Sequence, residues 1–562
     1  MTRQPFFELS APVTIAVLAV FYVGTFLVTS LIGRRRESAD AFMVSTRTLG
    51  FGMSAASMTA TWIWAASFYA SAASGYKYGL SGPIHYGLWG ALMIFFIYPF
   101  GQRFRQLAPN AHTLGEVMHA RHGKSSQLVL AVANVLGSGI SLMTNLTAAG
   151  AVVSVLSPLS FMHGVVIAAV GVLSFTLWSG FRAAVIADFI QVTGMIVIAV
   201  VVIPMVLFKI GGPGALVENF SRLTAEQRDP LSTTAILEQG APFFVAVLAY
   251  AIGNQTISQR LFAVRPDRIK SSFIAATVGY GSVVIGLGML GLMATTIGMR
   301  PADGDINNIV PQMASAFLPP IMVVMFFLLV LASLSSTTTS DLAALAAIVM
   351  TDVYGKNLAR GVPNPRVMLL LGRVTMIVVS TVGVILASLH LSILGMVVFL
   401  GALWGAIVFP VIVSCYWKRV TNRAFTAAVI SALVLFPLAR FELVPLRGPV
   451  GVFYELIAAI GGGVVLGLMA FGFLGRRVGI AIGSVAAVVF IPVFVGMLRE
   501  HAVLLGSLSV YGISAVVCVA VTLTSWNDFD FALIGKRVRD FQTAGEVEPT
   551  VAQPKITPTI PG

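Results

Sequence analysis

Long apolar runs constrain this chain more than any other feature. In the hydrocarbon core of a membrane the backbone must satisfy its own hydrogen bonds, so a run of about 20 apolar residues folds as a spanning helix. With 57% hydrophobic and only 10% charged residues, the chain has too little polar surface to cover such helices, which must therefore face lipid. The sequence predicts an all-α integral membrane protein. About fifteen transmembrane helices are expected, near residues 11–33, 51–75, 84–102, 127–157, 160–179, 182–209, 241–263, 270–298, 320–352, 366–389, 391–416, 422–439, 449–475, 478–498 and 502–525.

The basic residues indicate how the chain is oriented. The formal net charge is +13, which by itself would also fit a nucleic-acid-binding protein. Placing the N-terminus outside assigns 26 of the 35 Lys and Arg residues to the cytoplasmic side, as short cytoplasmic loops require. We therefore predict a multi-pass protein of the cell membrane with a cytoplasmic C-terminus, and no nucleic-acid partner.

The segments between the spans are short, which limits the classes of function. The first span is followed by Arg34-Arg35-Arg36 and lacks a small-residue cleavage site, so it is expected to be a retained helix rather than a signal peptide. Residues 211–240 form a hydrophilic loop, and the Pro/Thr-rich tail is expected to be disordered. Without a large soluble domain, the chain is predicted to be a transporter or a channel and not an enzyme.

Two of the predicted spans are interrupted. The second is crowded with Ser, Thr and Ala from Met53 to Ser67, and the seventh carries Gly253 followed by Asn254 and Gln255. Paired interruptions in the two halves of a transporter point to a midplane site, where unwound carbonyls and half-helix ends meet the solutes. Because the interrupted spans lie five helices apart, five-plus-five inverted repeats are expected. The alternative for the second span is an interior helix packed through its small residues.

Oxygen-bearing side chains gather at the end of the ninth span. Every residue from Ser335 to Asp341 carries a hydroxyl or a carboxylate, and hard cations prefer oxygen ligands. The alternative is a hydroxyl-rich helix end that reaches water. Asp188 lies inside the sixth span, where burying a charge costs free energy, so it is a candidate functional residue. It is expected to face either Arg182 or a cation.

Several motifs together resemble the sodium:solute symporter family. They are Asp40-Ala-Phe-Met43, Ser179-Gly-Phe-Arg-Ala-Ala-Val-Ile-Ala-Asp188, Gln259-Arg260-Leu-Phe-Ala263, Ala332 to Ser336, and Met350-Thr-Asp-Val-Tyr354. The resemblance implies a LeuT-type core of ten helices in a 5+5 inverted repeat, preceded by one helix and followed by four. It divides the chain into an N-terminal helix with its loop (1–50), the transport core (51–416), four additional helices (417–535) and a cytoplasmic tail (536–562).

The resemblance also implies ligand positions. In the family, one sodium ion is held by two carbonyls of the broken first core helix and by a carbonyl and two hydroxyls of the eighth. These ligands carry over to Ala60, Ile63, Ala332, Ser335 and Ser336. Some members hold a second sodium ion, for which the matching residues are Asp188, Thr338 and Thr339. The solute would lie between the broken helices, near Trp62, Trp64, Ser67, Tyr86, Tyr250, Asn254 and Gln255.

Within the family, the chain most resembles the urea/polyamine active transporter branch. The branch patterns W-T-W-A-A-T, K-Y-G-x-S-G-P and A-P-x-A-H-T appear here as Trp62-Ile-Trp-Ala-Ala-Ser67, Lys77-Tyr-Gly-Leu-Ser-Gly-Pro83 and Ala108-Pro-Asn-Ala-His-Thr113. One position differs, since Ala70 stands where the branch has a glutamine. No Lys or Arg lies in the interrupted stretches to pair with a carboxylate.

These features predict a sodium-coupled secondary active symporter that imports a small polar organic solute by alternating access. Urea, or a urea-like or polyamine solute, is the first candidate. The expected partners are this solute, Na+ as the coupling ion, and the lipid bilayer. The alternatives are proton coupling, a short monocarboxylate or amino acid as the solute, a facilitative channel, and a transporter-like sensor.

Overall fold

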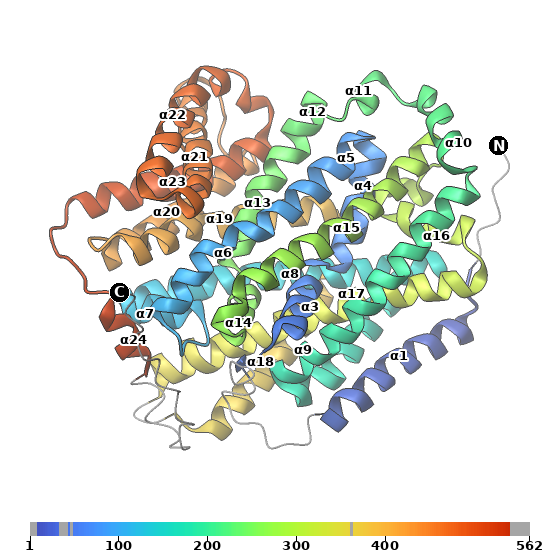
Figure 1. Cartoon of the computed structure of the whole chain (residues 1–562), viewed down its shortest axis with the longest axis horizontal. Helices are drawn as coiled ribbons and strands as arrows, with labels where there is room; N and C mark the ends of the chain where they lie inside the picture. Colours follow the sequence, from blue (N-terminus) through green and yellow to red (C-terminus); the bar gives the residue numbers. More distant parts are fainter. Residues whose placement is uncertain (1–7, 33–42, 45–48, 360–362, 540–562) are drawn as a thin grey trace, which may run out of the picture.

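The computed structural model of the chain describes residues 8–32, 43–44, 49–359 and 363–539 as helices joined by short connections (Figure 1). Among these residues there is no β-strand, and a single isolated bridge joins Leu49 to Val264. Within these described ranges, thirteen helices are long and apolar enough to cross a membrane. The prediction of an all-α membrane protein is confirmed.

The first part of the chain forms one separate helix and then the first half of a helical core. Its elements are α1 (Ala11–Ile32), α3 (Phe51–Trp62), α4 (Ala65–Tyr78), α5 (Ser81–Pro83), the π-helix η2 (Ile84–Leu88), α6 (Trp89–Leu107), α7 (Leu114–His122), α8 (Lys124–Leu156) and α9 (Phe161–Lys209). The expected hydrophilic loop at 211–240 contains only short helices. They are α10 (Gly212–Glu218), η3 (Asn219–Arg222), α11 (Ala225–Arg228), α12 (Thr233–Ala235) and η4 (Ile236–Gly240).

The second half of the core repeats the pattern of a broken helix followed by long ones. Its elements are α13 (Ala241–Gly253), α14 (Gln255–Ala263), η5 (Pro266–Arg268), α15 (Ile269–Thr296), η6 (Ala302–Gly304), η7 (Ile306–Asn308), α16 (Ile309–Phe317), α17 (Pro320–Ala347), η8 (Ile348–Leu358), α18 (Pro365–Ala387) and α19 (Ile393–Tyr416). The remaining helices are α20 (Asn422–Arg440), α21 (Gly448–Leu474), α22 (Arg476–Phe494), η9 (Leu498–Glu500), α23 (Ala502–Leu523) and α24 (Ala532–Arg539).

The predicted spans can be compared with these helices. Besides the thirteen long ones, the broken pair α3 and α4 and the apolar segment Phe161–Leu177 of α9 lie where spans were expected. The spans expected at 160–179 and 182–209 form one continuous element, α9. The number fifteen and the domain boundaries stay predictions. The basic run at 34–36, Asp40 and the tail beyond 539 lie outside the described residues, as does the side chain of Arg182.

Helix α4 is fixed in place by backbone contact with α15. A β-carbon at Gly75 would lie 2.0 Å from the carbonyl oxygen of Gly288, and one at Gly291 would lie 1.8 Å from that of Ala72. Glycine is therefore required at both positions, as in other close membrane helix pairs. This contact holds the second half of the first broken helix rigid beside the site described below.

Helices α20 to α23, drawn in orange and red, gather at one edge of the molecule, away from α1 in dark blue (Figure 1). Within this group α22 packs against α21 through glycines, since a β-carbon at Gly463 would lie 2.5 Å from the carbonyl oxygen of Gly483. Only 11% of the apolar stretch of α22 is buried inside the protein, so its outer face is available to contact lipid.

Candidate functional site

The first broken helix opens between α3 and α4. Ile63 (φ −90°, ψ 80°) and Trp64 (φ −78°, ψ 163°) leave the helical conformation there. In a continuous helix, the Trp64 N–H would donate to the Ala60 carbonyl. This hydrogen bond is missing, and no other described backbone group beyond the break donates to that carbonyl. The Ile63 carbonyl accepts a hydrogen bond of 2.5 Å from the Ser333 hydroxyl on α17.

The second broken helix opens between α13 and α14, and amide side chains fix its geometry. Asn254 (φ −81°, ψ 124°) is the N-cap of α14, and its Oδ1 accepts the Thr256 N–H at 2.7 Å. The Gln255 N–H donates to Oδ1 of Asn134 on α8 at 2.9 Å. Such capping satisfies the free N–H groups of a helix start, so the break is a built feature of the sequence.

The capping frees two carbonyls at the end of α13. In a continuous helix, the N–H groups of residues 255 and 256 would bond to the carbonyls of Ala251 and Ile252. Because both N–H groups are held by side chains instead, neither carbonyl receives its helical hydrogen bond within the described part of the chain. These carbonyls are free to accept from a ligand.

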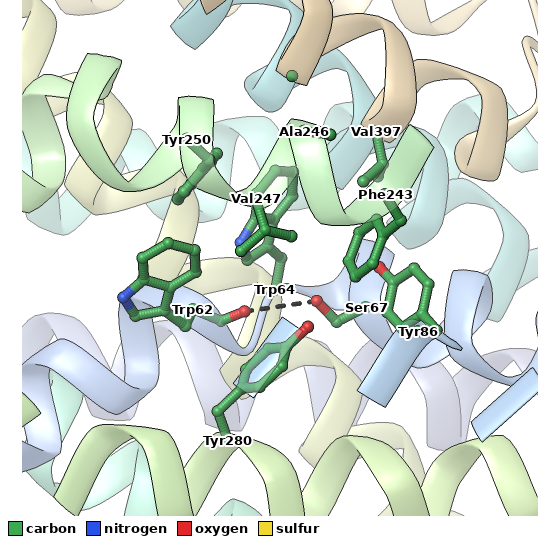
Figure 2. Close-up of a pocket in the computed structure, with 11 residues that line it drawn as sticks. Trp62, Trp64, Ser67, Tyr86, Phe243, Ala246, Val247, Tyr250, Tyr280 and Val397 are labelled. Atoms are coloured by element: carbon green, nitrogen blue, oxygen red, sulfur yellow. Dashed lines mark hydrogen bonds between the residues drawn. The ribbon is translucent and has the colours of Figure 1, made fainter. Parts of the chain in front are cut away.

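A small cavity lies between the first break and α13 (Figure 2). Its volume, counted as space for the centres of water-sized spheres, is about 20 Å³, and one water needs about 10–15 Å³ by that measure. The cavity has room for little more than a water molecule, so a solute enters only when it widens. Its lining consists of Trp62, Trp64, Ser67, Tyr86, Phe243, Ala246, Val247, Tyr250, Tyr280, Val397 and Gly401.

Aromatic rings form most of the cavity wall. The Tyr250 ring lies 4.8 Å from Trp62 and 4.8 Å from Trp64, centroid to centroid. Tyr86 stacks on Phe243 with ring centroids 4.1 Å apart. Figure 2 shows side chains of α13 converging on the broken stretch between Trp62 and Ser67. These rings pack against one another and make the wall largely apolar.

The polar groups of the cavity are uncharged. The Ser67 hydroxyl donates to the Trp62 carbonyl at 3.4 Å, and the hydroxyls of Tyr86 and Tyr280 lie beside Ser67. Trp62 Nε1 and the Tyr250 hydroxyl are buried and form no well-aligned hydrogen bond among the described residues. None of the lining residues is Asp, Glu, Lys or Arg. A few hydrogen-bonding groups in an otherwise apolar wall suit a neutral polar ligand.

The structure brings most of the predicted solute-binding residues together. Trp62, Trp64, Ser67, Tyr86 and Tyr250 all line the cavity. The other two predicted residues, at positions 254 and 255, are not part of its lining, and neither is the alanine at position 70. All of these assignments remain predictions about the solute.

The sequence did not suggest Phe243 or Tyr280 as lining residues. Phe243 lies seven residues before Tyr250, two turns along the same helix, so helical spacing could have identified it. Tyr280 comes from α15, whose contact with α4 only the fold establishes. No local signal in the sequence marks it.

The Gln255 side chain ties α14 to a short helix instead of facing the cavity. Its Nε2 donates to the His112 carbonyl at 3.0 Å and its Oε1 accepts the Leu114 N–H at 3.1 Å, at the start of α7. Thr113 caps this helix, because its hydroxyl accepts the Glu116 N–H at 3.0 Å. Burial raises the pKa of Glu116, but the charge of His112 and its hydrogen bonds outweigh burial and hold that pKa at about 2. Movement of α14 therefore requires movement of α7.

The predicted ligands of the first sodium ion lie on α3 and α17, two helices that are in contact at the first break. Ala60 and Ile63 lie at the break, and Ala332 lies on α17 beside the serine that binds Ile63. The Ser335 hydroxyl is buried near the Tyr22 hydroxyl of α1, and neither group forms a well-aligned hydrogen bond in the described structure. The Ser336 hydroxyl donates to Oδ1 of Asp188 at 2.8 Å and keeps its lone pairs. These oxygens fit a small hard cation, and the ligand set stays a prediction.

Asp188 is held by a buried guanidinium. Arg260 of α14 donates from Nη2 to Oδ2 of Asp188 at 2.8 Å and to the Ser340 hydroxyl at 2.7 Å. Its Nε donates to the Ser57 hydroxyl of α3 at 3.0 Å, and Ser57 in turn donates to Asp188 at 2.7 Å. The ion pair thus joins four helices, α3, α9, α14 and α17. The sequence named Asp188 together with Thr338 and Thr339, but the contacts of its carboxylate are with Ser57, Arg260 and Ser336.

Known proteins resemble this chain in sequence and in fold. Residues 42–431 match the model of the Sodium:solute symporter family. The chain belongs to this family. In its fold it resembles a Na+-coupled sialic acid symporter with a TM-score of 0.66 at 17% identity, over 84% of this chain and 97% of that one. The LeuT-type fold expected from the motifs is confirmed.

Curated relatives in the family differ in what their names say they transport. The chain is 24% identical to "Probable urea active transporter 1" of Schizosaccharomyces pombe, over 71% of this chain and 64% of that protein. It is 20% identical to "Urea-proton symporter DUR3" of rice (Oryza sativa subsp. japonica), over 71% of this chain and 60% of that protein. It is 22% identical to the Sodium/pantothenate symporter of Escherichia coli, over 84% of this chain and 97% of that protein. The match therefore spans about three fifths of the first two relatives.

Proposed function

We propose that this protein is a secondary active symporter that couples the entry of Na+ to the uptake of a small, uncharged polar organic solute, with urea as the first candidate. The cavity between the first break and α13 carries the proposal. It is small and aromatic, and its polar groups are hydroxyls and an indole N–H without a charged side chain. The names of the fungal and rice relatives support urea.

The proposed mechanism is alternating access around the two breaks. Sodium bound by Ala60, Ile63, Ala332, Ser335 and Ser336 would hold α3 against α17 and complete the solute site between α3, α4 and α13. Because the two ligands share these helices, each raises the affinity of the other by the same factor. Opening toward one side and then the other requires α14 and α7 to move together.

The second candidate function is proton-coupled transport of the same kind of solute. The rice relative is named a urea-proton symporter, which favours this alternative. A short monocarboxylate or an amino acid fits less well, because the cavity lining offers no cation to pair with a carboxylate. For a second sodium ion, Asp188, Thr338 and Thr339 remain a prediction, which the Arg260 ion pair weakens.

Uptake into proteoliposomes tests the proposal. Radiolabelled urea is offered under an inward sodium gradient at fixed pH and, separately, under a proton gradient without sodium. We expect accumulation in the first condition only. Accumulation under the proton gradient alone would replace sodium by a proton as the coupling ion, and equilibration without accumulation would indicate a channel. A thermal-shift screen of urea, polyamines, short carboxylates and amino acids, with and without sodium, would identify the solute.

Two variants locate the ion in this assay. Ser335→Ala removes a buried hydroxyl that forms no well-aligned hydrogen bond in the described structure, and we expect the sodium concentration for half-maximal uptake to rise about tenfold. Ser336→Ala should also raise it. Ser282→Ala is the matched control, because Ser282 is exposed on α15 and bonds only to its own helix. An unchanged value in Ser335→Ala would remove this residue from the ion site.

The orientation is part of the proposal. The distribution of basic residues puts the N-terminus outside and the C-terminus in the cytoplasm of the cell membrane. A protease site or an epitope added at the C-terminus should be accessible only after the membrane is opened.

A further inference from the structure

Asp341 is a buried carboxylate that the proposed mechanism leaves unused. It lies on α17, five residues beyond Ser336, and its side chain is fully buried. Its Oδ2 accepts a hydrogen bond of 2.6 Å from the Ser141 hydroxyl of α8. Its Oδ1 is buried without any hydrogen-bond partner among the described residues.

Asp341 differs in its partners from Asp188, another buried carboxylate of the core. Asp188 forms an ion pair with Arg260 at 2.8 Å and accepts from two serines. Arg260 donates to Asp188, Ser57, Ser340 and the Thr256 carbonyl, and among the described residues it forms no hydrogen bond with Asp341, on which it acts only through space. When Asp341 is ionised, Asp188, Arg260 and Asp341 together carry two negative charges and one positive charge, so Asp341 has no counter-ion of its own among them. A charge of this kind inside a membrane protein needs a partner.

Groups of the second break lie near Asp341. Arg260 of α14 donates to the Thr256 carbonyl at 3.1 Å and to the hydroxyl of Ser340, the neighbour of Asp341, at 2.7 Å. The Tyr250 hydroxyl lies close enough to interact with Asp341, Thr256 and Asn254. The hydroxyls of Tyr250 and Thr256 and the Asn254 Nδ2 are buried, and none of them forms a well-aligned hydrogen bond in the part of the chain that the structure describes. The carbonyls of Ala251 and Ile252, freed by the capping of α14, belong to the same break. Apart from Asn254 Nδ2, these atoms are oxygens that can bind a cation.

We propose that Asp341, Ser141, Tyr250, Thr256 and the freed carbonyls of α13 form a second sodium site, separate from the one at Ser335. Carboxylate, hydroxyl and carbonyl oxygens without nitrogen or sulfur are the ligands of a hard cation. The ion supplies the missing counter-charge of Asp341 and a partner for its free oxygen. The inference deepens the proposed function and rests on it.

This second ion would couple directly to the solute. Tyr250 contributes its hydroxyl to the ion site and its ring to the wall of the solute cavity. An ion that orders Tyr250 therefore favours solute binding, and the solute favours the ion by the same factor. At this site the second ion would bind Asp341, a carboxylate that forms no ion pair with an arginine.

Sodium binding to the purified full-length protein tests the inference without any transported solute. Equilibrium binding of ²²Na+ is measured for the wild type, Asp341→Asn, Ser335→Ala and the double variant. We expect two tightly bound ions per chain in the wild type. Each single variant should bind one of the two ions about tenfold or more weakly, and the double variant should bind both ions that weakly. Glu455→Gln is the matched control, because Glu455 is a buried membrane carboxylate whose partner is Arg499, in the additional helices. It should bind two ions.

The outcomes separate the two proposals. A wild type that binds no sodium would overturn sodium coupling itself. Two tightly bound ions in Asp341→Asn, with one in Ser335→Ala, would overturn only the second site. If Asp341→Asn does not remain monodisperse, Tyr250→Phe decides, because it removes one hydroxyl and keeps the ring. We expect it to weaken binding of one of the two ions about tenfold or more, and unchanged binding of both would reject the site.

Discussion

Contacts of a charged side chain join the two broken helices at both ends, and the two contacts differ in burial. At one end, Arg260 of α14 reaches Ser57 of α3 and pairs with Asp188, with both charged side chains 1% exposed. At the other end, Lys77 of α4 pairs with Glu238 of η4, just before α13, at 2.8 Å with side chains 52% and 39% exposed. Breaking a buried pair leaves a charge in the interior, whereas water replaces an exposed one. The polar contacts therefore favour opening at the Lys77 end from this closed conformation.

Replacing Arg260 should give the largest effect. Arg260→Gln leaves Asp188 buried without its counter-ion, which costs roughly 3–5 kcal/mol and releases α3 from α14. We expect a large drop in Tm of the purified protein and loss of uptake.

The double variant Asp188→Asn with Arg260→Gln is the control for this prediction. It removes both charges, so its Tm should lie between those of the wild type and Arg260→Gln. If the double variant is no more stable than the single one, the buried charge is not the cause of the loss.

The cap of the second break should matter next. Asn254→Ala removes the Oδ1 that accepts the Thr256 N–H, at a cost of about 1 kcal/mol in stability. Uptake should fall as well, because the break then loses its fixed geometry. Ser160→Ala is the matched control, since Ser160 caps α9 by accepting the His163 N–H far from the breaks. Ser160→Ala should lower Tm without changing uptake. If Asn254→Ala takes up as much solute as Ser160→Ala, the cap of the second break is not needed for transport.

Much of this comparison could be predicted from the sequence, for a physical reason. Apolar length requires spanning helices, and the Gly253-Asn254-Gln255 interruption breaks one of them. Local composition carries that information. The seven solute residues came from the resemblance to the symporter family, and five of them line one cavity.

The pairing of distant groups could not be predicted in this way. Asp188 was expected to face Arg182 or a cation, but its partner is Arg260, 72 residues later. Gln255 looked like a solute ligand because it sits at the break, yet its amide binds the start of α7. Such contacts depend on how α9, α14 and α17 pack, and no period or motif within one helix encodes that packing.

The first break allows a finer test, because a hydroxyl already occupies one predicted sodium ligand. Ser333 donates to the Ile63 carbonyl at 2.5 Å, so an ion there competes with this hydrogen bond. Ser333→Ala should lower the sodium concentration for half-maximal uptake about two- to tenfold, the equivalent of roughly 0.5–1.5 kcal/mol. Thr337→Val is the control, since Thr337 bonds only to the Ser333 carbonyl of its own helix. An increase in Ser333→Ala would mean that its hydroxyl itself binds the ion.

The exposed pair should give the smallest effect and the clearest contrast with Arg260. Lys77→Gln removes an ion pair worth about 0.2–1 kcal/mol, and the Tyr78 hydroxyl, which donates to Glu238 at 2.9 Å, remains. Salt screens exposed charges, so the difference in Tm from the wild type should shrink toward zero in about 1 M potassium chloride. The loss in Arg260→Gln should persist there, because that charge is buried. A salt-independent loss of several kcal/mol in Lys77→Gln would mean that both ends of the broken helices are held with equal strength, and that the closed conformation has no preferred side to open.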